Sequence, residues 1–253
     1  MRFAHPFVLL LVAFALASGC AGVQSKKTQE VTEQAEFKYK MGAAYFESHE
    51  IPLAIKSLTE ALAQNPDHKQ SHYLLAFIYQ GRRDYTKSIH HYNEALRIDP
   101  KYHFARNNLG TVYLTMERWD EAATQFATLL EEPLYPTPEL AHNNLGWAKY
   151  QRRRYQEALE HFKMATFLKP QLCLAHNNLG LTYQALQNNV EAFNSFGEAL
   201  RLCPQQYAEP HFHIGKLLAE AGDARARSHF EACARLEPGT NLGRRCREYL
   251  AVR

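Results

Sequence analysis

The tetrapeptide Asn-Asn-Leu-Gly occurs three times in this chain, and this repetition constrains the fold more than any other feature. The copies begin at Asn107, Asn143 and Asn177, so the two intervals are 36 and 34 residues. Self-similarity at such a period is typical of a solenoid, in which each unit packs only on its neighbours. Solenoids present extended surfaces to partners, so the repetition predicts a binding protein before it predicts a catalyst.

Six units can be aligned when the glycine of the motif is set at the eighth place of each unit. Place eight then always holds glycine or alanine, and a bulky residue follows sixteen places later, or fifteen in the last unit. Two antiparallel helices approach closely only where side chains are small, and a large side chain fills the space beside the contact. The place-eight residues are Gly42, Ala76, Gly110, Gly146, Gly180 and Gly215, and the bulky ones are Leu58, Tyr92, Phe126, Phe162, Phe196 and Phe230.

This pattern resembles the tetratricopeptide repeat, a helix–turn–helix unit of 34 residues. It predicts an all-α superhelix with six repeats over residues 35–240 and a capping helix over residues 241–253. Net charge is +3, and no basic stripe interleaved with aromatics occurs, so nucleic acid is not an expected partner. No nucleophile elbow, phosphate loop or HExxH motif occurs, so we expect neither an enzyme nor a cofactor. The histidine spacings favour no metal site.

The N-terminus carries an export signal. Arg2 is followed by an apolar run over residues 7–16, which is too short to span a membrane and is typical of a signal peptide. Small residues precede Cys20, and this arrangement resembles the lipobox of bacterial lipoproteins, which implies removal of residues 1–19 and acylation of Cys20. The alternative is an ordinary secretory peptide with an incidental cysteine. Residues 20–34 are predicted to form a short tether, and Ala21 after the cysteine implies export to the outer membrane.

The first helices of successive repeats are predicted to line a concave groove. In this fold the groove-facing places are two, five, nine and twelve of each unit, and here they are rich in aromatic and apolar side chains. An asparagine can bracket a peptide backbone, so Asn107, Asn143 and Asn177 either contact a ligand or serve the fold, whereas Asn108, Asn144 and Asn178 are expected to be structural. The predicted partner groove consists of Tyr39, Phe46, Tyr73, Phe77, Phe104, Asn107, Leu114, Leu140, Asn143, Trp147, Tyr150, Leu174, Asn177 and Leu181.

Four further cysteines occur in the C-terminal half. Cys173 opens the first helix of repeat five and Cys203 ends its second, so antiparallel packing allows a disulfide between them. Buried thiols are the alternative for this pair. For Cys233 and Cys246 the sequence favours free thiols. Export to an oxidising compartment permits disulfides in principle.

Residues 131–138 interrupt the array between repeats three and four. They contain three prolines, which force an extended connector and account for the longer first interval. With the lipobox, the six repeats and the chain length, this connector resembles the type IV pilus pilotins of the PilF/PilW/Tgl group, most closely the Tgl type. The resemblance implies a monomeric outer-membrane lipoprotein on the periplasmic face that binds secretin subunits and promotes their multimerisation for pilus biogenesis and motility. The alternative is another periplasmic scaffold, such as an adaptor for cell-wall enzymes.

Overall fold

The structure, a computed structural model, describes residues 30–204 and 207–251. All regular elements in these ranges are α-helices, which confirms the all-α repeat fold. Residues 30–47 form the first described helix. The helices that follow are α2 (Ile51–Gln64), α3 (Lys69–Gly81), α4 (Tyr85–Ile98), α5 (His103–Thr115), α6 (Trp119–Leu130), α7 (Pro138–Gln151), α8 (Tyr155–Leu168), α9 (Cys173–Ala185), α10 (Asn189–Leu202), α11 (Ala208–Glu220), α12 (Ala226–Leu236) and α13 (Asn241–Ala251).

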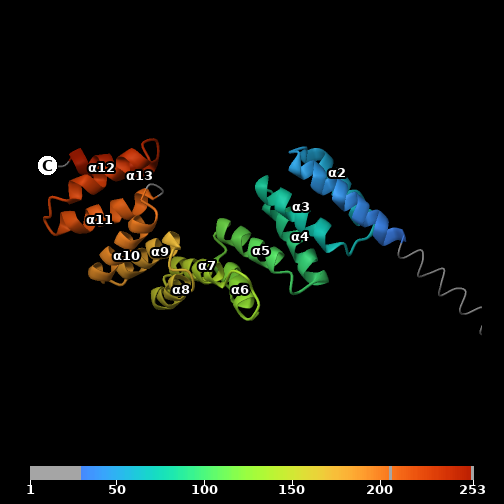
Figure 1. The fold of residues 1–253 in the computed structure, drawn as a ribbon, viewed down its shortest axis with the longest axis horizontal. Helices are drawn as coiled ribbons and strands as arrows, with labels where there is room; N and C mark the ends of the chain where they lie inside the picture. Colours follow the sequence, from blue (N-terminus) through green and yellow to red (C-terminus); the bar gives the residue numbers. More distant parts are fainter. Residues whose placement is uncertain (1–29, 205–206, 252–253) are drawn as a thin grey trace, which may run out of the picture. The chain divides into compact units, whose positions relative to one another are not determined.

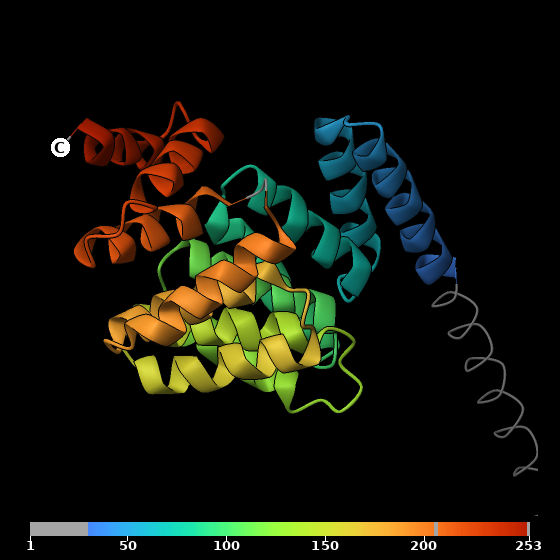
Figure 2. The same ribbon diagram turned by 60° about the vertical axis from the view of Figure 1, so that its left-hand side comes forward.

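The helices pack as antiparallel pairs, one pair to each repeat (Figure 1). The chain divides into two compact units at Asn108 and Leu109, within α5. In the first unit α3 packs on α2 and on α4. In the second unit each helix from α7 to α13 packs on its neighbours along the chain, and α11, α12 and α13 lie side by side at the C-terminal end (Figure 2).

The turn inside every repeat uses one residue with left-handed backbone. Its backbone N–H bonds back to the end of the first helix, as Arg83 N donates to Gln80 O at 3.0 Å. This geometry ends a helix sharply and reverses the chain within a few residues. The left-handed residue occupies place fifteen in all six repeats: His49, Arg83, Glu117, Arg153, Gln187 and Gly222. Repeat six keeps the same turn with glycine, although its second helix starts at Ala226, two places later than the second helices of the other repeats.

The predicted small–large contact forms the core of each repeat. The bulky residues from Leu58 to Phe196 are fully buried, and Phe230 is nearly so. A Cβ added to Gly180 would lie 2.5 Å from Phe196 Cδ1, so alanine cannot replace glycine there without a shift of the ring. The glycines thus set how closely the paired helices approach.

Several local features depart from or complete the sequence prediction. The predicted signal peptide and Cys20 lie outside the described residues, and residues 30–34 of the predicted tether are already helical. In the connector, Leu134 is exposed whereas Tyr135 is buried, so the tyrosine anchors a segment that the sequence presented only as extended. In α13, Tyr249 stacks on Phe230 with ring centroids 4.7 Å apart, which covers the last repeat.

Candidate partner-binding surfaces

The first unit carries a continuous run of aromatic rings on, or directly before, the first helices of its repeats. Phe46 contacts Phe77, with ring centroids 5.8 Å apart, and Tyr73 lies 5.2 Å from Tyr102 by the same measure. Phe77 is 42% exposed and Phe104 is 64% exposed, which is unusual for side chains of this size. We call Phe46, Tyr73, Phe77, Tyr102 and Phe104 the N-terminal aromatic surface. It can accept apolar side chains of a partner.

The second unit has its own aromatic contact on α7. Trp147 and Tyr150 stack with centroids 5.4 Å apart and planes 9° from parallel. Both are partly buried against the cores of repeats four to six, and the predicted groove residues Leu140 and Leu174 remain exposed. The sequence therefore located two surfaces with exposed apolar side chains, one in each unit. Whether these residues contact a partner stays a prediction.

The structure corrects the predicted exposure of three groove residues. Asn143 and Asn177 are only 3% and 1% exposed, and Leu181 is also buried. Close packing of successive repeats buries these side chains. Asn178 Nδ2 of repeat five, for example, donates to Asn143 Oδ1 of repeat four at 3.0 Å. Asn177 Nδ2 donates to Glu209 Oε2 at 2.8 Å in the next repeat. The first asparagines of these motifs thus join neighbouring repeats instead of lying open to solvent.

The second asparagine of the motif also serves the fold, as expected. Asn108 Nδ2 donates to the hydroxyl of Tyr73 at 3.2 Å, one repeat earlier in the chain. Since Tyr73 belongs to the N-terminal aromatic surface, this bond holds its ring in place. Lys149, which stands where four repeats have tyrosine, is mostly covered and pairs with Glu157 at 3.0 Å.

Three histidine pairs connect the two helices of repeats two, four and six. The Nδ1 atoms are 3.0 Å apart in His72–His91, 3.1 Å apart in His142–His161 and 3.0 Å apart in His211–His229. One ring must donate and the other accept, so the pair is stable only while at least one imidazole is neutral. Sequence reasoning missed these pairs, although the separations of 19, 19 and 18 residues repeat in alternate units.

Burial keeps these imidazoles neutral. It lowers the pKa of His91, His161 and His211 to about 4, and the neighbouring histidine of each pair adds to the effect. Burial also lowers the pKa of His72, His142 and His229. Each pair therefore resists protonation in the native state.

Both cysteine pairs form disulfides. Cys173 and Cys203 are joined with their Cα atoms 6.2 Å apart, which resolves the two alternatives left open for this pair. Cys233 and Cys246 are joined with Cα atoms 6.1 Å apart, so the expectation of free thiols was wrong for them. The reason is that α13 folds back on α12, which places the two side chains face to face in the core.

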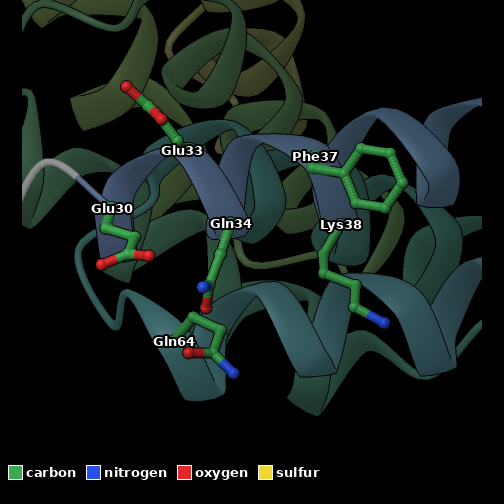
Figure 3. Close-up of a pocket in the computed structure, with 6 residues that line it drawn as sticks. All are labelled: Glu30, Glu33, Gln34, Phe37, Lys38 and Gln64. Carbon is green, nitrogen blue, oxygen red and sulfur yellow. The ribbon is translucent and has the colours of Figure 1, made fainter.

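A pocket of about 330 Å³ opens beside the first described helix (Figure 3). Gln34 and Gln64 approach each other from facing helices, and Phe37 and Lys38 flank them (Figure 3). The lining contains no nucleophile paired with a base, so it does not suggest a catalytic centre. Within residues 30–204 and 207–251, no group of three or more potential metal ligands comes together. No helix in the same ranges is long and apolar enough to cross a membrane.

The chain belongs to the tetratricopeptide repeat family. One family model, described as a tetratricopeptide repeat, matches residues 39–103 and 107–172, and a second matches residues 175–206. Together these segments include most of the array in which the structure shows paired helices. The class of protein is therefore a tetratricopeptide scaffold, which suggests a role in protein–protein interaction rather than catalysis.

Among individual proteins, the chain is similar to the type IV pilus assembly protein PilF of Pseudomonas aeruginosa. They are 25% identical over 164 residues, which span 62% of this chain and 65% of PilF. Two solved structures have the same fold. PilW, described as a widely conserved type IV pilus biogenesis factor, gives a TM-score of 0.70 at 23% identity, with 83% of this chain and 97% of PilW covered. The structure of Pseudomonas aeruginosa PilF gives a TM-score of 0.72 at 20% identity, and the match covers 87% of this chain and 99% of PilF. The predicted resemblance to this group is confirmed, whereas particular closeness to Tgl stays a prediction.

Proposed function

We propose that the protein is an assembly factor for type IV pili that binds secretin subunits and promotes their multimerisation in the outer membrane. The observation that carries the proposal is the N-terminal aromatic surface, whose rings are exposed on a scaffold similar to pilus biogenesis factors. The similarity of the chain to PilF and PilW supports the role in pilus biogenesis. Secretin as the partner follows from the resemblance of the whole chain to the pilotins.

The physical mechanism is transient capture of an apolar segment. Each large apolar side chain fully removed from water contributes about 1.5–3 kcal/mol, so a segment that covers Phe77 and Phe104 gains several kcal/mol before its own ordering cost. This is enough for a complex that neighbouring subunits can later displace. The surface thus protects an aggregation-prone segment until the ring forms.

Anchoring by Cys20 would raise the efficiency of this capture. A cysteine with several acyl chains stays in the membrane, whereas a single chain gives only marginal binding. Confinement at the outer membrane raises the effective concentration of the scaffold where a secretin ring must form. Lipidation and outer-membrane location are thus parts of the proposal.

A gene-deletion strain complemented with variants tests this function. We expect loss of heat- and detergent-resistant secretin multimers in the deletion strain and recovery with the wild type. Phe77→Ser combined with Phe104→Ser should fail to restore multimers, because both rings lose their apolar contact area. Phe167→Ser is the control, since Phe167 is an even more exposed ring on a second helix, away from the predicted groove.

Normal multimers in the deletion strain, with a change only in cell-wall turnover, would overturn the proposal and favour the cell-wall adaptor. Full complementation by the double variant would instead show that the N-terminal aromatic surface is not the capture site.

A further inference from the structure

Glu209 is a fixed carboxylate on the first-helix face of the second unit. It lies at place two of repeat six, one of the places that face the predicted groove, and it remains partly exposed. Asn177, buried in the preceding repeat, holds its Oε2 through a bond of 2.8 Å. No lysine or arginine in the part of the chain that the structure describes forms an ion pair with it. Lys216 on the same helix is two turns further along, roughly 10 Å away by helical rise.

The surroundings of this carboxylate are aromatic. Burial is the main cause of the raised pKa of both Tyr150 and Tyr207, and the negative charge of Glu209 raises each of them further. Tyr207 precedes Glu209 by two residues, and Tyr150 packs on the core cluster that includes Ala208, the chain neighbour of Glu209. Tyr150 in turn stacks on Trp147, so an indole face belongs to the same group of side chains. The carboxylate thus lies in the neighbourhood of rings whose faces are electron-rich.

The amide that holds Glu209 has an unmet hydrogen-bond demand. Asn177 Oδ1 is buried without a partner, although Nδ2 of the same amide is bonded to the carboxylate. An unsatisfied buried acceptor costs about 1–3 kcal/mol, and such groups call for a bound species that donates. The two groups at this place, the Glu209 carboxylate and the unpartnered amide oxygen, are both acceptors.

We propose that Glu209, Asn177, Tyr150, Tyr207 and Trp147 form a binding site for the basic side chain of a partner segment. The inference rests on the proposed function and adds the chemistry of the partner: a lysine or arginine beside the apolar residues that dock on this face. Ammonium and guanidinium groups carry only donors, which matches the two acceptors at the centre of the site, the Glu209 carboxylate and Asn177 Oδ1. The ring faces attract the same cations, most strongly at tryptophan.

Alternative ligands fit less well. A carboxylate or phosphate group would face Glu209 with like charge, and a neutral amide or hydroxyl would leave that charge unmatched. The site therefore selects for a positively charged side chain. A basic residue in the docking segment would fix its position along the face, while the apolar contacts supply most of the area.

Selection of displayed random 12-residue peptides on the immobilised full chain tests the site without assuming a partner. Peptides selected on the wild type should be enriched in lysine or arginine next to aromatic or aliphatic residues, and selection on Glu209→Gln should lose that enrichment. For individual selected peptides, Glu209→Gln should weaken binding about tenfold, as should replacement of the basic residue by norleucine. Glu191→Gln is the matched control, because Glu191 is an exposed carboxylate on a second helix.

Circular dichroism melts must show that Glu209→Gln folds like the wild type. Equal binding of all selected peptides to Glu209→Gln, or no basic enrichment, would overturn the site. A second arm uses an array of 15-residue peptides that covers the cognate secretin. Basic enrichment in the random peptides with no secretin peptide bound would retain the site and refute the secretin partner. Secretin peptides that bind the wild type and Glu209→Gln equally would refute the site and retain the proposed function.

Discussion

The three histidine pairs should make the stability of the array depend on pH between about 6.5 and 4. In an unfolded chain each imidazole titrates near 6.5, whereas burial lowers the pKa of one member of each pair to about 4. Between these values the unfolded state binds more protons than the native state, so stability rises with pH. The stabilising contribution of the pairs is complete above about pH 6.5 and is lost as the pH falls towards 4.

The magnitude follows from the size of the shift. A fall from 6.5 to about 4 corresponds to at most about 3 kcal/mol for each pair, at 1.36 kcal/mol per pKa unit. The rings are partly exposed, so solvent screening reduces this to roughly 1.5 kcal/mol. More than half of this stabilisation is lost by pH 5. The loss in the free energy of unfolding is about 1 kcal/mol per pair and about 3 kcal/mol for the three pairs together.

Urea unfolding of the wild type and of a triple variant at pH 7.5 and pH 5.0 measures this. The variant combines His91→Asn, His161→Asn and His211→Asn, because an asparagine amide can replace Nδ1 in a hydrogen bond but does not titrate. We expect the wild type to lose about 3 kcal/mol more than the variant on acidification. Carboxylates titrate in both proteins, so their contribution cancels in the difference.

His176→Asn is the matched control for this experiment. His176 occupies the same place in repeat five as His142 in repeat four, but Ser195 stands where a paired histidine would be. The control should keep the pH dependence of the wild type. An unchanged pH dependence in the triple variant would refute the reasoning, because the loss of stability would then come from other groups.

Three further outcomes are expected. Gly180→Ala should lower the free energy of unfolding by about 1–3 kcal/mol in urea titrations, because its Cβ would lie 2.5 Å from the facing phenylalanine ring. Gly197→Ala, which meets no atom within 4 Å, should instead raise it by about 0.5–1 kcal/mol, and equal effects at the two sites would contradict the packing argument. Replacing Cys173 and Cys203 by serine should cost about 3 kcal/mol by the same measurement, and no loss would show that the bridge does not restrict the unfolded chain. Cys20→Ala should leave the far-ultraviolet circular dichroism unchanged but release the protein from the outer-membrane fraction, and continued recovery there would count against lipid anchoring.

Much of the fold could be predicted because the repeat encodes its own contacts. A glycine or alanine at place eight pairs with a bulky residue at place twenty-four, or twenty-three in repeat six, so one alignment located the core from Leu58 to Phe230. Such periodic contacts depend on helix geometry alone. The same reasoning located the exposed rings Phe77 and Phe104.

The features that the sequence did not reveal depend on contacts between helices. Asn143 and Asn177 share a place with groove residues, yet both are buried and form hydrogen bonds with residues of the next repeat. The histidine pairs involve place four and place twenty-three, or twenty-two in repeat six, which no single-helix pattern brings together. The Cys233–Cys246 bridge required knowledge of how α13 returns to α12.

The positions of the two disulfides have a consequence for how the array comes apart. A linear repeat protein frays from its ends, because terminal repeats have only one neighbour. The bridge between Cys233 and Cys246 ties the C-terminal helix to repeat six, and the bridge between Cys173 and Cys203 closes repeat five. No disulfide occurs among the described residues of repeats one to four. Opening should therefore begin at the N-terminal repeats and proceed in one direction, so that proteases release shortened fragments which retain the C-terminal end.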